Sequence, residues 1–192
     1  MTVQTAAQGW IGLGVGNAME DSFMFVAWKN SSDGITLSDR SPADHTIPPY
    51  AANQVSKIVT LDSTIASPSW AKMSFSFSRP IESPDVTFTP TSSFIYAYTK
   101  SKKPTALDNP AASISFHNVY NFIGELDLIG RGDSSPPITT TTTTTTSSPS
   151  PTTTIASTSG KCVGTSFCLY GQPDGAGNVV FTIHSSANGV CS

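Results

Sequence analysis

Charged side chains are scarce in this sequence. Asp, Glu, Lys and Arg make up 12% of its 192 residues, and 13 acidic side chains outnumber 10 basic ones, for a formal net charge of -3. The basic residues are scattered along the chain and form no patch, so the sequence offers no electrostatic field for a nucleic acid. We therefore expect no nucleic-acid partner.

Long apolar runs are lacking as well. No segment approaches the roughly 20 apolar residues that a membrane span needs, so we expect none in this chain. The N-terminal residues MTVQTAA also have neither the basic nor the apolar region of a signal peptide. Two features are nevertheless typical of secreted glycoproteins: the sequon Asn30-Ser31-Ser32 and a tract of Thr, Ser and Pro at residues 134–159. The absent signal therefore needs an explanation.

The Thr/Ser/Pro tract contains no charged or aromatic residue. It cannot bury enough apolar surface to offset the entropy lost when a chain becomes ordered. We therefore interpret residues 131–160 as a disordered linker between two parts of the protein.

An internal repeat offers an explanation for the missing signal. Residues 2–9 align without a gap with residues 182–189 and share three identities in eight positions. The alternative is chance similarity in a chain that is rich in Ser and Thr. If the repeat is real, the chain begins inside one domain, and residues 161–192 are the start of a second copy.

Helical periodicity is absent too, since no window of 11 or more residues follows the helical period. Short apolar runs bounded by Gly, Pro, Asn and Asp recur about every ten residues, which favours an all-β sandwich. Residues 72–78 alternate cleanly and place Met73, Phe75 and Phe77 on one face. The sequence thus predicts an antiparallel β-sandwich over residues 1–130, with strands at 10–15, 22–28, 34–37, 57–61, 72–78, 94–98, 113–117 and 122–128.

Beyond the linker, residues 167–171 and 178–184 are predicted to form a C-terminal β-hairpin around the turn at 173–177. A two-stranded hairpin alone is only marginally stable in water. The linker, at up to ~3 Å per residue, is long enough to bring the hairpin back to the first domain. We expect the hairpin to replace that domain's missing first strands, as in a circular permutant.

The stretch Gly9-Trp-Ile-Gly-Leu-Gly-Val-Gly-Asn-Ala-Met-Glu-Asp-Ser-Phe-Met-Phe-Val-Ala-Trp28 carries a more specific signature. It resembles the Gly-Trp-x-Gly, Gly-x-x-Met and Val-Ala-Trp elements of the DOMON family, in particular the cytochrome domain of cellobiose dehydrogenase and related carbohydrate-binding-domain-9-like proteins. The resemblance covers residues 2 to 130, and residues 161 to 189 again as a truncated copy. The other matching stretches are Ile35-Thr-Leu-Ser-Asp-Arg40, Phe75-Ser-Phe-Ser-Arg-Pro80, Phe94-Ile-Tyr-Ala-Tyr98, Ile114-Ser-Phe-His-Asn118 and Leu126-Asp-Leu128.

This resemblance implies an immunoglobulin-like β-sandwich that holds haem b between a methionine and a histidine. The family's axial ligands fall on Met19 and His117. A thioether and an imidazole would fill both axial positions of the iron, so such a centre transfers single electrons and turns over no substrate. No Cys-x-x-Cys-His motif occurs, so haem would be held non-covalently. The family's run of glycines before the methionine is here Gly16-Asn17-Ala18, which is a departure from the pattern.

For both proposed ligands, a purely structural role is an alternative interpretation. Met19 can fill a gap at the sandwich edge, and His117 can be a surface residue that is hydrogen-bonded to a neighbour. His45 is interpreted as solvated and His184 as structural. Arg131-Gly-Asp133 resembles an adhesion tripeptide, but such triplets are common by chance. Trp10 and Trp28 are expected in the core.

The three cysteines do not suggest a metal centre, because neither a Cys-x-x-Cys pair nor a cluster of histidines accompanies them. Cys162 and Cys168 can close a small disulfide loop in an oxidising compartment. Cys191 is then left over.

Two functions from different classes remain open. The first is an extracellular haem b electron-transfer module, linked by resemblance to lignocellulose breakdown, with a flavin dehydrogenase, a membrane reductase or a copper oxygenase as redox partner. The second is a haem-free carbohydrate-binding module, in which Trp70, Tyr96 or Tyr98 would form an exposed strip that stacks on polysaccharide. A third alternative is a non-functional fragment that aggregates through an exposed sheet edge.

Overall fold

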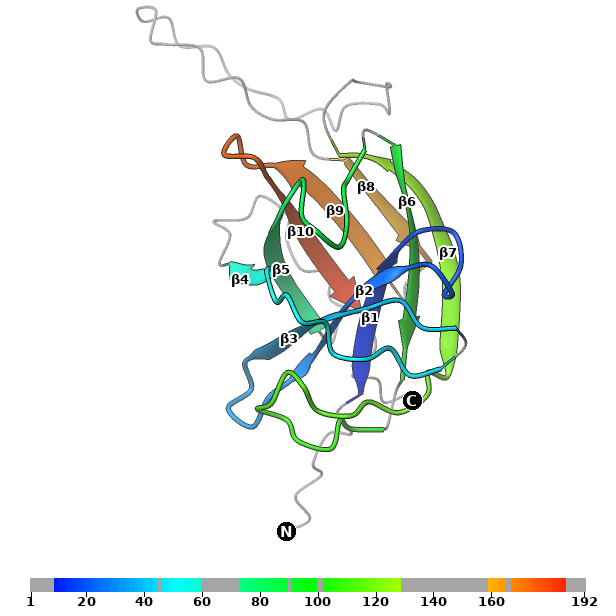
Figure 1. Ribbon diagram of the computed structural model, residues 1–192, viewed down its shortest axis with the longest axis vertical. Helices are drawn as coiled ribbons and strands as arrows, with labels where there is room; N and C mark the ends of the chain where they lie inside the picture. Colours follow the sequence, from blue (N-terminus) through cyan, green and yellow to red (C-terminus); the bar gives the residue numbers. More distant parts are fainter. Residues whose placement is uncertain are drawn as a thin grey trace, which may run out of the picture.

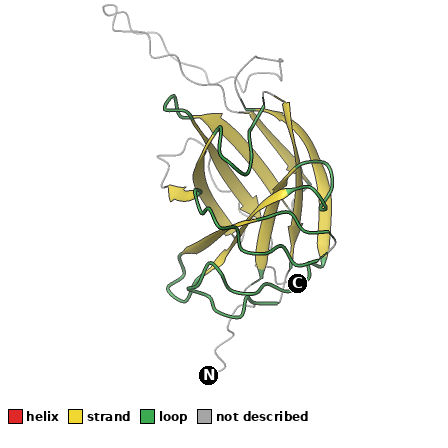
Figure 2. Cartoon of the chain, in the orientation of Figure 1, coloured by secondary structure: helices red, strands yellow, loops and turns green. Residues whose placement is uncertain are grey.

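A computed structural model describes residues 9–44, 46–59, 73–89, 91–99, 102–128, 159–164 and 167–185. Ten strands and their connecting loops make up this part of the chain, and it contains no helix (Figure 2). None of the described segments therefore has the helical length and hydropathy that a bilayer crossing requires.

The ten strands form two antiparallel sheets of five strands each. This confirms the predicted all-β antiparallel sandwich. The first sheet has the order β3 (Ile35–Arg40), β2 (Phe23–Lys29), β1 (Trp10–Val15), β6 (Thr91–Tyr98) and β7 (Val119–Asp127). The second sheet has the order β4 (Lys57–Val59), β5 (Met73–Pro80), β10 (Asn178–Ser185), β9 (Phe167–Pro173) and β8 (Ser159–Val163).

The C-terminal strands lie inside the second sheet. Figure 1 shows β10 beside β5, with β9 and β8 following it to the edge of the sheet, all three drawn in orange to red. β10 pairs with β5 along its whole length, from Asn178 opposite Pro80 to Ser185 opposite Met73. The hairpin is therefore part of the sandwich. That it replaces missing first strands, and that the chain is divided into tandem copies, stay predictions.

The edge of the second sheet holds the predicted disulfide. Cys162 on β8 and Cys168 on β9 face each other in register and are joined by a disulfide bond. β8 itself was not predicted, and it begins at Ser159, within the expected linker. Cys191 lies outside the described residues.

Phenylalanine rings fill the space between the two sheets. Phe25 from the first sheet contacts Phe77 and Phe181 from the second, at centroid distances of 5.3 and 6.3 Å. Phe88 and Phe94 complete the group against Phe181. The predicted face of β5 points inward as expected, and its three apolar side chains, Met73, Phe75 and Phe77, are buried here. Aromatic pairs at such distances add to the stabilisation that burial provides.

One ion pair is buried inside this apolar region. Arg79 on β5 donates from Nη1 to Oδ2 of Asp39 on β3 at 2.7 Å, and both side chains are fully buried. The same carboxylate oxygen accepts the backbone N–H groups of Val55 and Ser56. A buried charge of this kind is tolerated only when it is paired and hydrogen-bonded. The pair thereby links the two sheets.

The first sheet is apolar on its outer face as well. Trp10, Met24, Val26 and Trp28 form a second buried cluster there, which confirms the expected burial of both tryptophans. Because β1 and β2 are buried on both faces, their sequences are continuously apolar instead of alternating. Three loops cover this outer face: residues 16–22, here called the methionine loop; residues 41–44 and 46–50, the proline loop; and residues 102–118, the cover loop.

The cover loop corrects one sequence prediction, because residues 113–117 do not form a strand. The residues just before this segment are held by side chains of the sheet, and Ser113 O accepts a hydrogen bond from the Thr105 N–H within the same loop. The carbonyl of Leu107 accepts hydrogen bonds from Trp28 Nε1 and Thr36 Oγ1. Arg40 Nη2 donates to the carbonyls of Pro110 and Ala112.

Candidate functional site

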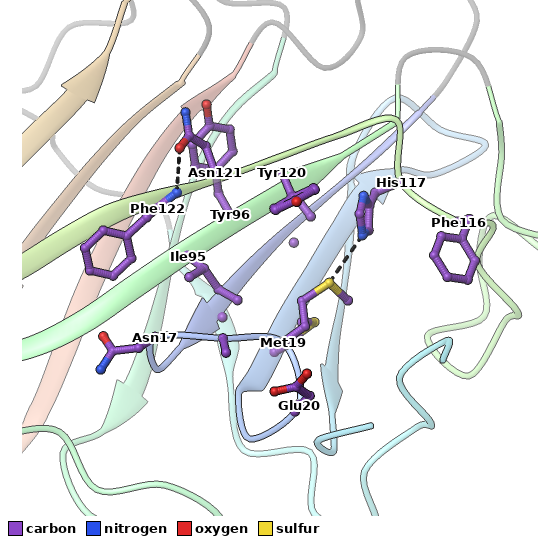
Figure 3. A pocket seen from close by; sticks show the side chains of 15 residues that line it. Asn17, Met19, Glu20, Ile95, Tyr96, Phe116, His117, Tyr120, Asn121 and Phe122 are labelled. Carbon is purple, nitrogen blue, oxygen red and sulfur yellow. Dashed lines mark hydrogen bonds between the residues drawn. The ribbon is translucent and has the colours of Figure 1, made fainter. Parts of the chain in front are cut away.

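Met19 and His117 come together over the outer face of the first sheet. Met19 lies in the methionine loop, which follows β1, and His117 lies at the end of the cover loop, just before β7. His117 Nε2 is 3.2 Å from Met19 Sδ, and Figure 3 shows the two side chains pointing at each other. Two residues that are 98 positions apart in the sequence therefore present their donor atoms to one point.

The His117 ring is suited to act as a neutral donor. Burial lowers its pKa below the ordinary value of 6.5, because a less hydrated site disfavours the charged imidazolium. Near neutral pH the ring is therefore uncharged and keeps a lone pair. Bonds from sulfur or imidazole to a transition metal are about 2.0 to 2.3 Å long, so the Met19 and His117 donor atoms must separate by roughly 1 Å to admit a metal atom between them.

A cavity of about 410 Å³ opens on one side of this pair. Its volume falls within the range that is usual for cofactor sites. The lining is mostly apolar, and the residues in it that carry polar groups on their side chains are Asn17, Glu20, Tyr96, His117, Tyr120 and Asn121. The complete lining is Gly12, Gly14, Asn17, Ala18, Met19, Glu20, Met24, Ile95, Tyr96, Ala97, Phe116, His117, Tyr120, Asn121 and Phe122.

A second cavity, of about 20 Å³, adjoins the same pair, with Ile47 and Pro48 of the proline loop in its wall. Five residues line both cavities: Met19, Met24, Ala97, Phe116 and His117. The Met19–His117 contact thus adjoins both spaces, and the two spaces share part of their lining.

Glycine residues form part of the floor. A Cβ atom at Gly12 would make ordinary contacts, 3.4 Å from Trp10 Cζ3, whereas one at Gly14 would lie 2.7 Å from Ile95 Cγ1. Both positions line the larger cavity. The absence of side chains on β1 therefore lets a bound group approach the sheet closely.

The methionine loop is fixed at both of its ends. It begins at Gly16, whose φ of 141° is unfavourable for residues with a side chain. The Gly16 N–H donates to Ser93 O at 2.9 Å. At the other end, the Ser22 hydroxyl donates to Ala18 O. These contacts hold Met19 above the cavity.

The segment around His117 is anchored on both sides of the ring. The Asn118 N–H donates to Tyr98 O at 3.0 Å, and Thr99 Oγ1 lies 2.7 Å from Asn118 Oδ1. On the other side, Trp10 Nε1 donates to Ser115 Oγ at 3.4 Å. The end of β6 and the start of β1 therefore determine where His117 is placed.

Arg40 joins two of the loops to each other. Its buried guanidinium donates to Pro110 and Ala112 in the cover loop, and to Pro48 O in the proline loop at 3.5 Å. Burial lowers the Arg40 pKa, although the nearby Tyr50 opposes this effect. Arg40 is a cross-strand neighbour of Met24, which lines both cavities. The sequence analysis did not identify Arg40 as part of the site.

The proposed sugar-stacking strip is wrong for the residues that can be checked. Tyr96 and Tyr98 are only 3% and 4% exposed, because their rings point into the sandwich core. Tyr96 stacks on Phe167 of the second sheet at a centroid distance of 4.4 Å. Trp70 lies outside the described residues. Neither tyrosine is available to a polysaccharide.

The remaining predicted residues lie away from the cavity or outside the described residues. His184 is buried in β10, and a 2.9 Å hydrogen bond joins its Nδ1 and Ser74 Oγ, in keeping with a structural role. His45 and the tripeptide at residues 131–133 lie outside the described residues. In the described part, no three His, Cys, Asp or Glu side chains gather into a group that could hold a metal ion.

Three exposed aromatic rings border the larger cavity and were not predicted. Phe116, Tyr120 and Phe122 are 55%, 71% and 51% exposed. The alternation along β7 was a possible signal, since Tyr120 and Phe122 share one face of that strand. The alternation of apolar residues along a strand, however, does not show which face of the strand points into the core and which points outward.

The arrangement brings a thioether and a neutral imidazole to one point inside an apolar cleft. The family model for the cytochrome domain of cellobiose dehydrogenase, a DOMON-type domain, matches residues 1–128, which is two thirds of the 192 residues. Cytochrome modules of this kind transfer electrons, and they are extracellular. No curated protein and no solved structure matches the chain. The chain belongs to the family of the cytochrome domain of cellobiose dehydrogenase.

Proposed function

We propose that this chain binds haem b non-covalently, with Met19 and His117 as the two axial ligands, and acts as a one-electron transfer module. The observation that carries the proposal is the 3.2 Å contact between Met19 Sδ and His117 Nε2, beside a largely apolar cavity of about 410 Å³. Met19 and His117 would hold the haem iron, and the apolar lining would contact the porphyrin.

Further features of the chain fit this cofactor. Gly12 and Gly14 place no side chain on the floor of the larger cavity, which suits a flat ring that lies close to β1. The sequence has no Cys-x-x-Cys-His motif, which argues for non-covalent binding. The donor set is small, but two axial ligands are sufficient because the porphyrin nitrogens would supply the other four.

Haem, when bound, supplies a one-electron redox couple. Met19 and His117 would occupy both axial positions, which leaves no position for oxygen or a substrate and favours electron transfer over catalysis. The methionine sulfur would also favour the reduced state. The apolar lining limits the access of water, and the lowered pKa of His117 keeps its ring available as a donor near neutral pH.

We further propose that the module is extracellular and exchanges electrons with a flavin dehydrogenase, a membrane reductase or a copper oxygenase in lignocellulose breakdown. The family supports this proposal. The disulfide between Cys162 and Cys168 suits an oxidising compartment. Polysaccharide binding has less support, because Tyr96 and Tyr98 are buried.

Titration of the purified chain with hemin tests the proposal. The wild type is expected to give a sharp Soret band and the visible spectrum of a six-coordinate, low-spin haem, which changes on reduction with dithionite. Met19→Leu and His117→Gln should each abolish the low-spin spectrum.

The matched controls are Met24→Leu and His184→Gln, which replace a second methionine of the same cavities and the buried histidine of β10. Both should keep the low-spin spectrum. A wild-type protein that gives no spectral change with hemin, or a Met24→Leu variant that loses the low-spin form while Met19→Leu keeps it, would contradict the proposed ligands.

A further inference from the structure

The imidazole of His117 lies between two aromatic rings. The Tyr120 ring is 5.3 Å from it, centroid to centroid, at an interplanar angle of 65°, and the Phe116 ring is 5.6 Å away at 42° (Figure 3). Tyr120 comes from β7 and Phe116 from the end of the cover loop. The imidazole is therefore enclosed on either side by rings from two different elements.

Packing in the core does not explain why a tyrosine is found at position 120. It is 71% exposed and is the most exposed large hydrophobic side chain among the described residues. Its edge-to-face contact with His117 is of the kind that aromatic pairs favour. Such a contact restricts the rotation of the imidazole about its Cβ–Cγ bond, which determines the direction of Nε2.

We infer that Tyr120 is a positioning residue for His117: its ring, with Phe116 opposite, holds the imidazole so that Nε2 points at Met19 Sδ. The consequence for haem binding rests on the proposed function. The ring contact itself is a property of the protein without cofactor, so it can be tested separately.

Phe122 provides a matched control on the same strand. It lies two residues after Tyr120, on the same face of β7, lines the same cavity and is 51% exposed. Within the described residues, however, the rings that pack against His117 are those of Phe116 and Tyr120. A general loss of apolar lining affects Tyr120→Ala and Phe122→Ala alike, whereas a loss of positioning affects Tyr120→Ala alone.

The first experiment uses the full chain and hemin, with the dissociation constant and the low-spin fraction as readouts. Tyr120→Ala should weaken hemin binding roughly two- to tenfold, the range expected for one edge-to-face pair, and should raise the high-spin fraction. Tyr120→Phe should restore both values. Phe122→Ala removes cavity lining but no ring that packs on His117, so it should weaken hemin binding less than Tyr120→Ala does and should not raise the high-spin fraction. The inference is overturned if Tyr120→Ala binds as the wild type does, or if Phe122→Ala is impaired to the same degree.

The second experiment needs no haem. The ring protons of His117 are assigned in the NMR spectrum by comparison with His117→Gln, since the chain has three histidines. Tyr120→Ala should shift these signals through the loss of the tyrosine ring current and should weaken the nuclear Overhauser effect between His117 and the Met19 methyl group. If that effect keeps its wild-type strength, Tyr120 does not position the ring. If the wild type fails to bind hemin while Tyr120→Ala shows the expected shift and the weakened effect, the proposed function is overturned and the positioning role is supported.

Discussion

Both faces of the first sheet carry buried apolar side chains, but the two faces have different neighbours. The inner face packs on a second sheet, and rings such as Phe25, Phe77 and Phe181 fill the space between them. The outer face is covered by loops instead of a sheet, and there a cavity of about 410 Å³ remains beside Met19 and His117.

This difference shows how one sheet can serve stability and binding at once. Two sheets can interdigitate their side chains along their full length, so voids between them are small. Loops follow the sheet less closely, and they are held at separate points such as Arg40 and Trp28. We therefore expect substitutions on the inner face to change mainly the folding stability and those on the outer face to change mainly the binding of hemin.

The largest effect is expected from Phe181→Ala on the inner face. Phe181 is fully buried and contacts four other phenylalanine rings, so its removal leaves a cavity and should lower the free energy of unfolding by about 3 to 5 kcal/mol. Urea denaturation measures the change. The exposed Phe122→Ala is the control and should cost less than about 1 kcal/mol. Equal losses in both variants would mean that the inner face has no special part in stability.

An intermediate effect is expected from Arg40→Met, which removes the donor that joins the cover loop to the proline loop. Buried carbonyl groups lose their partner, at a cost of about 1 to 3 kcal/mol in unfolding free energy. Hydrogen exchange should increase in residues 102–118 more than in β5 or β10. The control is Lys29→Met, which breaks an exposed ion pair with Asp33 and should cost no more than about 1 kcal/mol.

A smaller effect of opposite sign on stability is expected from Gly12→Ala. The added Cβ meets only ordinary contacts, so the loss of freedom in the unfolded chain should raise the unfolding free energy by up to about 1 kcal/mol. The same methyl group occupies the cavity floor and should weaken hemin binding about threefold or more. Urea denaturation and hemin titration of one preparation measure both values. If hemin binding is unchanged, the glycine floor is not part of the site.

The smallest effect is expected from pH. Burial lowers the pKa of His184 below 6.5, as it does for His117. The unfolded chain then binds protons near pH 6.5 that the folded chain still excludes, so stability is full above this pH and falls as the pH decreases. Urea midpoints between pH 7.5 and 5 should show this decline, and His184→Gln should reduce its slope. A midpoint that rises on acidification would contradict the assignment.

The strands could be predicted to a large extent, because composition and periodicity act locally. The predicted strand at 10–15 matches β1, and those near 22–28 and 178–184 match β2 and β10 within a residue or two. The strand at 113–117 was wrong because Arg40, Trp28 and Trp10 hold the cover loop from distant parts of the sheet. Such contacts leave no pattern in the local sequence.

The site was accessible only through the family resemblance. Met19 and His117 were singled out by motif, and the structure brings them to 3.2 Å, while their role as ligands stays a prediction. Phe116 and Tyr120 were missed because nothing in an alternating strand tells which ring packs on the histidine. Tyr96 and Tyr98 were assigned to the wrong environment for the same reason, since both faces of β6 carry large apolar groups.

The pairing of β10 with β5 has a consequence for how the chain reaches its native state. Phe77 and Phe181 are register partners although 104 positions separate them in the sequence. Contacts so distant along the chain close slowly, because the loop entropy is lost before they form. During synthesis the first sheet can assemble early, but β5 has to wait for a neighbour whose paired residues lie 104 positions further along the chain, as Phe77 and Phe181 do. The nascent protein therefore passes through a stage in which the inner apolar face of the sandwich is exposed to solvent. At this stage a chaperone would be most useful in preventing aggregation.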